Sequence, residues 1–229
     1  MPLRVAGRPS AMGKSFDLLV FDWDGTLVDS AGHIVDSIQA AAGDLGLDSP
    51  SEERARYIIG LGLADALTYL FPGLSQTDYP RLVERYRHHY LVGDHKLALF
   101  AGASQGIRAL HASGFSLAVA TGKSRQGLDR ALEISGLRVF FHASRCGDEG
   151  LPKPHPDMLV YLMSALGADP RRTLMIGDTT HDLDMARSAG VPAIAVGYGA
   201  HSRASLEAHQ PLACVMSFTE LTRWVRQNG

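Results

Sequence analysis

Two aspartates lie two residues apart near the start of the sequence, in the segment Asp22-Trp23-Asp24-Gly25-Thr26 that follows an apolar run. One carboxylate, ionised, could attack phosphorus, and the other, protonated, could donate a proton to the leaving oxygen. Gly25 would allow a tight turn and a close approach of the backbone to a small ligand. Taken alone, the segment has an ordinary Asp-Gly turn at the start of a loop as its alternative.

A second polar segment, Thr121-Gly122-Lys123-Ser124, follows another apolar run and opens a helical stretch. Backbone N–H groups at a helix N-terminus bind anions, and the Thr121 hydroxyl can add a donor. The Gly-Lys-Ser string is not a P-loop, because Leu117 occupies the position at which that motif requires glycine. The alternative for Ser124 is a simple helix N-cap.

A lysine between prolines forms the third segment, Leu151-Pro152-Lys153-Pro154. Prolines on both sides restrict the backbone and thereby fix the direction of the ammonium group. A fixed cation could neutralise phosphate charge and keep a nearby carboxylate ionised. A solvent-exposed lysine in a proline-rich turn is the alternative.

The fourth segment, Gly177-Asp178-Thr179-Thr180-His181-Asp182, places two aspartates four residues apart, one helical turn along the chain. Mg²⁺ prefers oxygen ligands and is held by one or two carboxylates, with waters and substrate phosphate completing its shell. Asp178 could instead be a helix N-cap. We expect His181 to lie at the surface and not to bind a ligand.

The elements that must position these segments are short apolar runs alternating with helical stretches. The runs cover residues 18–21, 117–120, 174–177 and 193–196, and helical spacing is found over 124–136, 157–166 and 179–189. Runs that are apolar on both faces, separated by helices, predict a doubly wound α/β fold with a parallel, Rossmann-like sheet. Ligands bind beyond the carboxyl ends of such strands, where the polar segments would meet.

About 90 residues separate Gly25 from the second run, many more than a plain crossover requires. Candidate helices at 34–45, 52–59, 64–70 and 81–91 fill this interval. We therefore predict a smaller α-helical cap domain over residues 31–99, a core domain over 16–30 and 100–229, and a flexible N-terminal tail over 1–15.

Composition limits the possible partners. The chain has 22 basic and 24 acidic residues, a net charge of −2, 45% hydrophobic residues and no basic block, so nucleic-acid binding is not expected. The apolar runs are too short to span a membrane. Cys146 and Cys214 lie far apart and form no CxxC pair, which fits a reducing compartment and a cytoplasmic location. Monomer and homodimer both remain open.

The ordered set Asp22-x-Asp24-Gly25-Thr26, Thr121-Gly122, Lys153-Pro154 and Gly177-Asp178-x-x-x-Asp182 resembles the haloacid dehalogenase-like (HAD) hydrolase superfamily. Within it, the chain is similar to the phosphoglycolate phosphatase-like branch, which has a helical cap inserted after the first motif. The resemblance extends from Phe16 almost to the C-terminus; the core motifs are specific as a set, and the cap is much less so.

The resemblance implies a role for each motif residue. Asp22 would be the nucleophile and a Mg²⁺ ligand, and Asp24 the general acid and then base, with its main-chain carbonyl on the metal. Thr121 and the Gly122 amide would hold the phosphoryl oxygens, and Lys153 would neutralise them, with Gly25 beside the substrate. The metal would be bound directly by Asp178 and supported by Asp182.

The implied activity is Mg²⁺-dependent hydrolysis of a small-molecule phosphate monoester through an aspartyl-phosphate on Asp22. Asp24 argues against a dehalogenase, because such an enzyme expels halide and needs no proton donor. It also argues against the ATPases of this lineage, since the resemblance implies that they would have threonine at this position. A phosphosugar mutase of the same fold and a non-catalytic phosphate-binding regulatory protein remain as alternatives. Residues 64–70 lack the arginine expected in an enzyme that selects a carboxylate such as phosphoglycolate, so the substrate stays open. The turn at 59–63 is expected to reach into the crevice.

Overall fold

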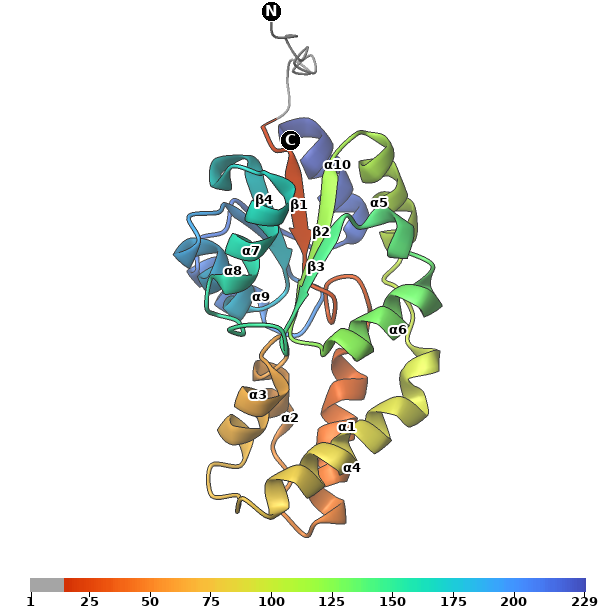
Figure 1. Cartoon of the computed structure of the whole chain (residues 1–229), viewed down its shortest axis with the longest axis vertical. Coiled ribbons are helices and arrows are strands. Elements are labelled where there is room, and N and C mark those ends of the chain that lie inside the picture. Colours follow the sequence, from red (N-terminus) through yellow and green to blue (C-terminus); the bar gives the residue numbers. More distant parts are fainter. Residues whose placement is uncertain (1–14) are drawn as a thin grey trace, which may run out of the picture.

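A six-stranded parallel sheet forms the centre of the molecule in the computed structural model, which describes residues 15–229 (Figure 1). The strand order is β3-β2-β1-β4-β5-β6. The strands are β1 (Leu18–Phe21), β2 (Ser116–Thr121), β3 (Ala143–Cys146), β4 (Thr173–Gly177), β5 (Ala193–Val196) and β6 (Ala213–Val215). The predicted tail, residues 1–15, lies outside the described residues apart from Ser15.

Helices cover both faces of the sheet because the side chains of each strand alternate between the faces. Leu19 and Phe21 of β1 pack in a cluster with residues of α5, α6 and α10, whereas Leu18 and Val20 pack with residues of α7 and α8. These helices and their neighbour α9 are α5 (Ala103–Ala112), α6 (Arg125–Ser135), α7 (Asp157–Leu166), α8 (Thr180–Ser188), α9 (Arg203–Ala208) and α10 (Phe218–Asn228). The prediction of a doubly wound α/β core is confirmed.

All four predicted apolar runs are strands, but the sheet has two more. The unpredicted strands β3 and β6 are the outermost strands of the sheet. The β3 sequence Ala-Ser-Arg-Cys is mostly half-buried, because an edge strand has a neighbour on one side only. Such a strand carries no continuous apolar run, which is why the sequence pattern did not indicate it.

Four helices between β1 and β2 form a group of their own beyond the carboxyl ends of the strands (Figure 1). They are α1 (Ala31–Asp44), α2 (Glu52–Tyr57), α3 (Leu63–Leu70) and α4 (Asp78–Gly93), and we call them the helical insert. The insert has an apolar interior separate from the sheet, in which Ala41 of α1, Leu67 of α3 and Leu82 of α4 are buried together.

The two chain segments that join the insert to the sheet run beside each other. Val28 and Leu99 form an antiparallel bridge, and two backbone bonds flank it: Asp29 N donates to Ala98 O at 3.0 Å and Phe100 N to Leu27 O at 2.9 Å. The insert is therefore attached through a short two-stranded ribbon. In the described part of the chain, no helix has the length and apolar character needed to cross a membrane.

Candidate active site

Asp22 is the first residue after β1, at the carboxyl edge of the sheet. Its backbone N–H still donates to Ile176 O of β4 at 2.9 Å, which fixes the residue between the two central strands. Its carboxylate oxygen Oδ1 accepts the Trp23 N–H at 2.7 Å and faces the Lys153 ammonium at 2.8 Å. The other oxygen, Oδ2, is buried and has no hydrogen-bond partner. One oxygen of Asp22 is thus anchored and the other is available.

Asp178 and Asp182 come from the junction of β4 and α8. The sequence folds this way because Thr179 is the N-cap of α8 and makes a capping box with Asp182, whose Oδ2 accepts both the Thr179 hydroxyl (2.7 Å) and its N–H (3.1 Å). Gly177 is required here, since a Cβ on it would lie 2.3 Å from the Asp182 carboxyl carbon.

The Asp178 carboxylate is oriented from two sides. Thr26 Oγ1 donates to Oδ1 at 2.8 Å, and the Ala200 N–H donates to Oδ2 at 2.7 Å. Gly25 and Gly199 both pack against this carboxylate, and a Cβ at either position would lie within 2.3 Å of its Oδ2. The turn at Asp24-Gly25 therefore packs directly against the carboxylate of Asp178.

Lys153 forms ion pairs with both Asp22 and Asp182. Its side chain is 0% exposed, and its Nζ lies 2.8 Å from Asp22 Oδ1 and 2.7 Å from Asp182 Oδ1. Its loop follows β3, the strand beyond β2, so the lysine is brought in from a distant part of the sequence. The two carboxylates more than offset the effect of burial, and the pKa of Lys153 is raised, so its ammonium stays charged.

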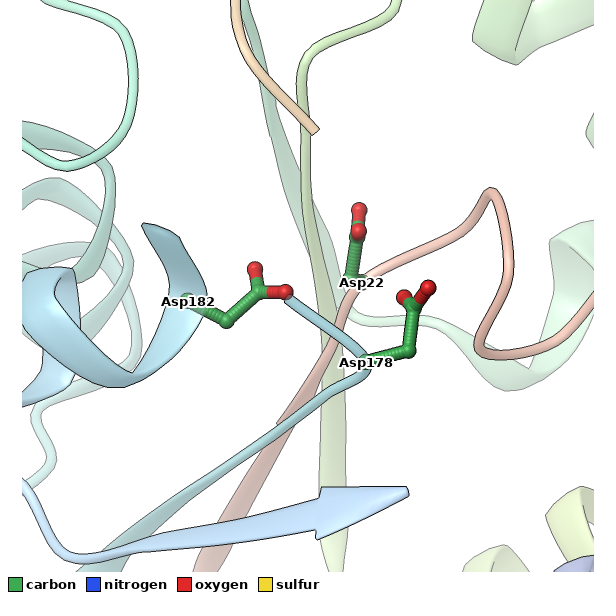
Figure 2. Close-up of side chains that lie close together, drawn as sticks. All are labelled: Asp22, Asp178 and Asp182. Carbon is green, nitrogen blue, oxygen red and sulfur yellow. The ribbon is translucent and has the colours of Figure 1, made fainter. Parts of the chain in front are cut away.

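Three carboxylates converge beside this lysine. Ligand oxygens of Asp22, Asp178 and Asp182 all lie within 4.8 Å of one another, and Figure 2 shows the three side chains projecting toward one region. Burial, with the neighbouring carboxylates adding to it, raises the pKa of Asp22 well above its usual range and that of Asp178 to about 7. The single positive charge of Lys153 does not neutralise three buried carboxylates. A hard divalent cation fits this all-oxygen set, which includes the unpartnered Oδ2 of Asp22.

Asp24 lies apart from this cluster and has different partners. Its Oδ1 accepts the Ser30 hydroxyl at 2.8 Å, and its two oxygens lie 3.1 and 3.0 Å from Lys123 Nζ. The same ammonium donates to the Tyr90 hydroxyl of α4 at 2.7 Å and lies 4.6 Å from the centre of that ring. Asp24 is thereby connected to the helical insert through Lys123.

Thr121 and Gly122 lie at the end of β2, where the insert touches the core. Thr121 is fully buried, and its Oγ1 accepts the Lys123 N–H at 3.2 Å. The turn predicted to reach the crevice does so: a Cβ on Gly122 would lie 2.3 Å from Leu61 O, and one on Gly60 would lie 3.9 Å from Asp22 Oδ2. The insert therefore covers the site beside Asp22 and Gly122.

His181 is not a surface residue, contrary to our expectation. Its Nε2 lies 2.7 Å from the Tyr57 carbonyl oxygen of α2, and His201 Nε2 lies 3.1 Å from the same oxygen. His201 Nδ1 accepts the Thr180 N–H at 3.0 Å, so its Nε2 must be the donor to Tyr57. A polar residue in the first turn of a helix is predicted from sequence to be exposed, but here the insert covers His181.

The structure thus brings Asp22, Lys153, Asp178 and Asp182 together, and places Asp24 apart from them in a separate ion pair with Lys123. Thr121, Gly122 and Gly25 line the same edge of the sheet. Sequence reasoning missed the contacts of Lys123 and Ser30 with Asp24, and the contact of Tyr90 with Lys123. A lysine directly after a strand-end Thr-Gly was the available signal, but it was considered only as part of a P-loop string.

The chain belongs to the haloacid dehalogenase-like hydrolases, since the model of that family matches residues 19–196, more than half of the sequence. It is 37% identical over 211 residues to a protein of Dickeya dadantii (strain 3937) named "Probable phosphatase IndB", covering 89% of this chain and 91% of the relative. It is 32% identical over 191 residues to the phosphoglycolate phosphatase of Agrobacterium fabrum (strain C58), covering 80% and 81%.

Solved structures agree with this assignment. The crystal structure of a predicted phosphoglycolate phosphatase from Haemophilus somnus superposes with a TM-score of 0.81 at 26% identity, over 92% of this chain and 98% of the other. The chain therefore has the fold of this hydrolase family, with the helical insert included in the match.

Proposed function

We propose that this protein is a Mg²⁺-dependent phosphatase that hydrolyses small-molecule phosphate monoesters through an aspartyl-phosphate on Asp22, in the manner of the phosphoglycolate phosphatase-like relatives. The observation that carries the proposal is the convergence of three buried aspartates and one buried lysine, with the Oδ2 atom of Asp22 left unpartnered. An available oxygen on a fixed carboxylate, beside a fixed cation, is what attack on a phosphoryl group requires.

In the first step, an oxygen of Asp22 attacks phosphorus, and the bond between phosphorus and the substrate's alcohol oxygen breaks. Asp24 gives its proton to that oxygen, which leaves as a neutral alcohol. In the second step, a water molecule attacks the phosphorus, Asp24 takes a proton from the water, and Asp22 is released together with inorganic phosphate. Thr121, the Gly122 amide and Lys153 hold the charge on the phosphoryl oxygens throughout.

The metal would be held by Asp22, the main-chain carbonyl of Asp24 and Asp178, with Asp182 in support. When bound, Mg²⁺ neutralises charge on the phosphoryl group and on the surrounding carboxylates. In the supporting role, Asp182 Oδ1 lies 2.7 Å from Lys153 Nζ, and its Oδ2 accepts the Thr179 hydroxyl.

We further propose that the helical insert is a mobile cap domain over residues 31–99 and that the core consists of 16–30 and 100–229. The separate apolar interior of the insert and its attachment through a narrow ribbon support this division. The contacts of Gly60 and Leu61 with the site support a closing role, which would exclude water. Free Cys146 and Cys214 are compatible with a cytoplasmic location.

The direct experiment is a panel of phosphorylated metabolites, including sugar phosphates, phosphoglycolate and nucleotides, assayed for phosphate release with Mg²⁺. We expect release from at least one small monoester, complete loss with a chelator and recovery when Mg²⁺ is returned. Phosphate release that persists after chelation would contradict the metal dependence.

The phosphosugar mutase remains the alternative because it would use the same two aspartates. Product analysis separates the two functions: a mutase conserves total phosphate ester, whereas a phosphatase converts it to inorganic phosphate. A regulatory protein that only binds phosphate would release none from any member of the panel.

A further inference from the structure

Lys123 is the second of two buried lysines, and the proposed chemistry does not yet use it. Residues 15–229 contain three lysines, of which Lys96 is exposed and Lys153 is bound to Asp22 and Asp182. The Lys123 side chain is 10% exposed and its ammonium is shared by Asp24 and the Tyr90 hydroxyl. A buried cation beside a proposed proton donor requires an explanation.

The position of Lys123 in the reaction follows from its partner. Asp24 must face the oxygen that leaves with the alcohol, so whatever that alcohol carries next to its oxygen lies close to Lys123. In the structure both Asp24 oxygens face this ammonium at 3.1 and 3.0 Å, and Ser30 holds one of them from the other side. To turn toward the leaving oxygen, Asp24 must give up part of this pairing, and the ammonium then needs another anion.

The space beside Lys123 can hold such a group. A cavity of about 280 Å³ lies between the end of the insert, α6 and the residues after β1. Its lining is mainly apolar and includes Trp23, Val28, Leu97 and Leu99, together with Lys123. Its volume is sufficient for the carbon body of a small leaving group, and Lys123 and Tyr90 are among the residues that line it.

Within residues 15–229, the lining of this cavity contains one other cation, Arg130. It is 53% exposed and bound to Asp94 at 2.7 and 3.2 Å. In the insert, Arg54 is engaged with the carbonyl oxygens of Tyr69 and Leu70, and Arg85 with Asp44. Lys123 thus supplies the cation that helix α3 lacks.

We propose that Lys123 is a specificity-determining residue that binds a second anionic group, a carboxylate or a second phosphate, on the alcohol that the enzyme releases. The substrates would then be phosphate monoesters with a further anion close to the ester oxygen. This inference rests on the proposed function. Tyr90 acts as a positioning residue, because its hydroxyl holds the ammonium at the boundary between the insert and the core.

The test compares substrates that differ only in the second anion. Phosphoglycolate is paired with ethyl phosphate for the carboxylate, and 1,3-propanediol bisphosphate with propyl phosphate for the second phosphate, using the full-length protein with Mg²⁺. A charge-assisted contact predicts that kcat/KM favours the anionic member of at least one pair by about 10–100-fold. The pair with the larger ratio of kcat/KM values identifies which anion the enzyme prefers.

Variants assign the preference to Lys123. Lys123→Met should reduce the ratio to about three or less, since a charge-assisted contact accounts for the whole preference. Lys123→Arg should retain part of it, and Lys96→Met, the same change at an exposed lysine of the insert, should leave it unaltered. These controls also account for any binding of Mg²⁺ by the substrate's second anion, which no substitution in the protein would change.

The outcomes are distinct. A wild-type ratio near one for both pairs overturns the inference while leaving the phosphatase proposal in place, and this result does not depend on whether any variant folds. A ratio that survives in a folded Lys123→Met protein also overturns it. No phosphate release from either pair or from p-nitrophenyl phosphate would overturn the proposed function itself, and the inference with it.

Discussion

The two ends of the site each contain a buried lysine–aspartate arrangement, and the two arrangements are built differently. At the phosphate end, Lys153 is fully buried, contacts two aspartates and lies entirely within the core. At the leaving-group end, Lys123 contacts one aspartate, and its remaining partner, Tyr90, belongs to the helical insert. The ion pairs of the first arrangement involve no residue of the insert, whereas the second includes Tyr90 of the insert.

This difference separates reaction from recognition. The groups that would act on phosphorus are fixed by the sheet and by helix α8, which makes them independent of the substrate's identity. The groups that would meet the alcohol depend on contacts between core and insert, where a small change in sequence could alter the preference. Four experiments test this contrast, and the first is expected to have the largest effect.

Asp22→Asn should reduce kcat by about 10⁴-fold or more, because the amide cannot serve as the nucleophile. The fold should be retained, since the side chain has the same shape and one buried charge is removed from the carboxylate cluster. Phosphate release and thermal unfolding would be measured on the same preparation. Substantial residual turnover would exclude the covalent route.

Asp24→Asn should slow turnover by about 10²–10⁴-fold, the range for loss of a proton donor and acceptor. Because the variant cannot activate water, phosphoenzyme should accumulate when the substrate has a good leaving group such as p-nitrophenolate. Acid quench after mixing with ³²P-labelled p-nitrophenyl phosphate would reveal labelled protein. Unlabelled protein together with wild-type rates would remove Asp24 from the mechanism.

Lys153→Met should lower the free energy of unfolding by about 3–5 kcal/mol without Mg²⁺, because two fully buried carboxylates lose their counter-ion. Lys123→Met should lower it less, since Asp24 is 11% exposed and keeps its hydrogen bond from Ser30. Urea denaturation of the two variants, side by side, gives the comparison. Equal losses would mean that the two ends of the site are not energetically different.

Acidification should weaken the contact between insert and core at His181 and His201. Burial lowers the pKa of both imidazoles, so the unfolded chain binds more protons than the native protein below the ordinary histidine pKa of about 6.5. The contribution of the two neutral imidazoles to the free energy of unfolding is therefore complete above about pH 6.5. It is lost as the pH falls from there through the lowered pKa values of the native protein. Thermal unfolding of the metal-free protein and of a His201→Gln variant across pH 5–8 would measure it by difference, because Asp178, whose pKa is raised to about 7, titrates in the same range in both proteins.

His201→Gln should flatten this dependence, because it removes one of the titrating groups while leaving a side-chain donor for Tyr57 O. An unaltered profile in this variant would assign the pH effect to other groups.

Much of the core could be predicted from sequence, because its strands are apolar on both faces and end in the polar residues that define the site. Leu18–Phe21 followed by Asp22, and Thr173–Gly177 followed by Asp178, are patterns of this kind. The edge strands β3 and β6 escaped prediction since each is half-covered and carries no uninterrupted apolar run.

The contacts between insert and core could not be predicted, because they join residues far apart in the sequence through groups with no characteristic spacing. Tyr57 meets His181 and His201, and Tyr90 meets Lys123, only once the insert is in place. Composition and periodicity describe each helix by itself and do not indicate which polar side chain another helix will cover. The leaving-group end of the site therefore became visible only in three dimensions.

The pairing of Val28 with Leu99 has a consequence for how such a protein can diversify. Residues directly opposite each other on antiparallel strands lie about 4.5–5.5 Å apart at their Cα atoms, so the whole insert enters and leaves the core at nearly one point. A helical unit of another length or sequence could be spliced in at that point without displacing a single strand. Exchanging inserts between relatives at this junction would replace Tyr90 and the rest of the insert beside Lys123, while Lys123 itself and the residues proposed to act on phosphorus would come from the recipient core.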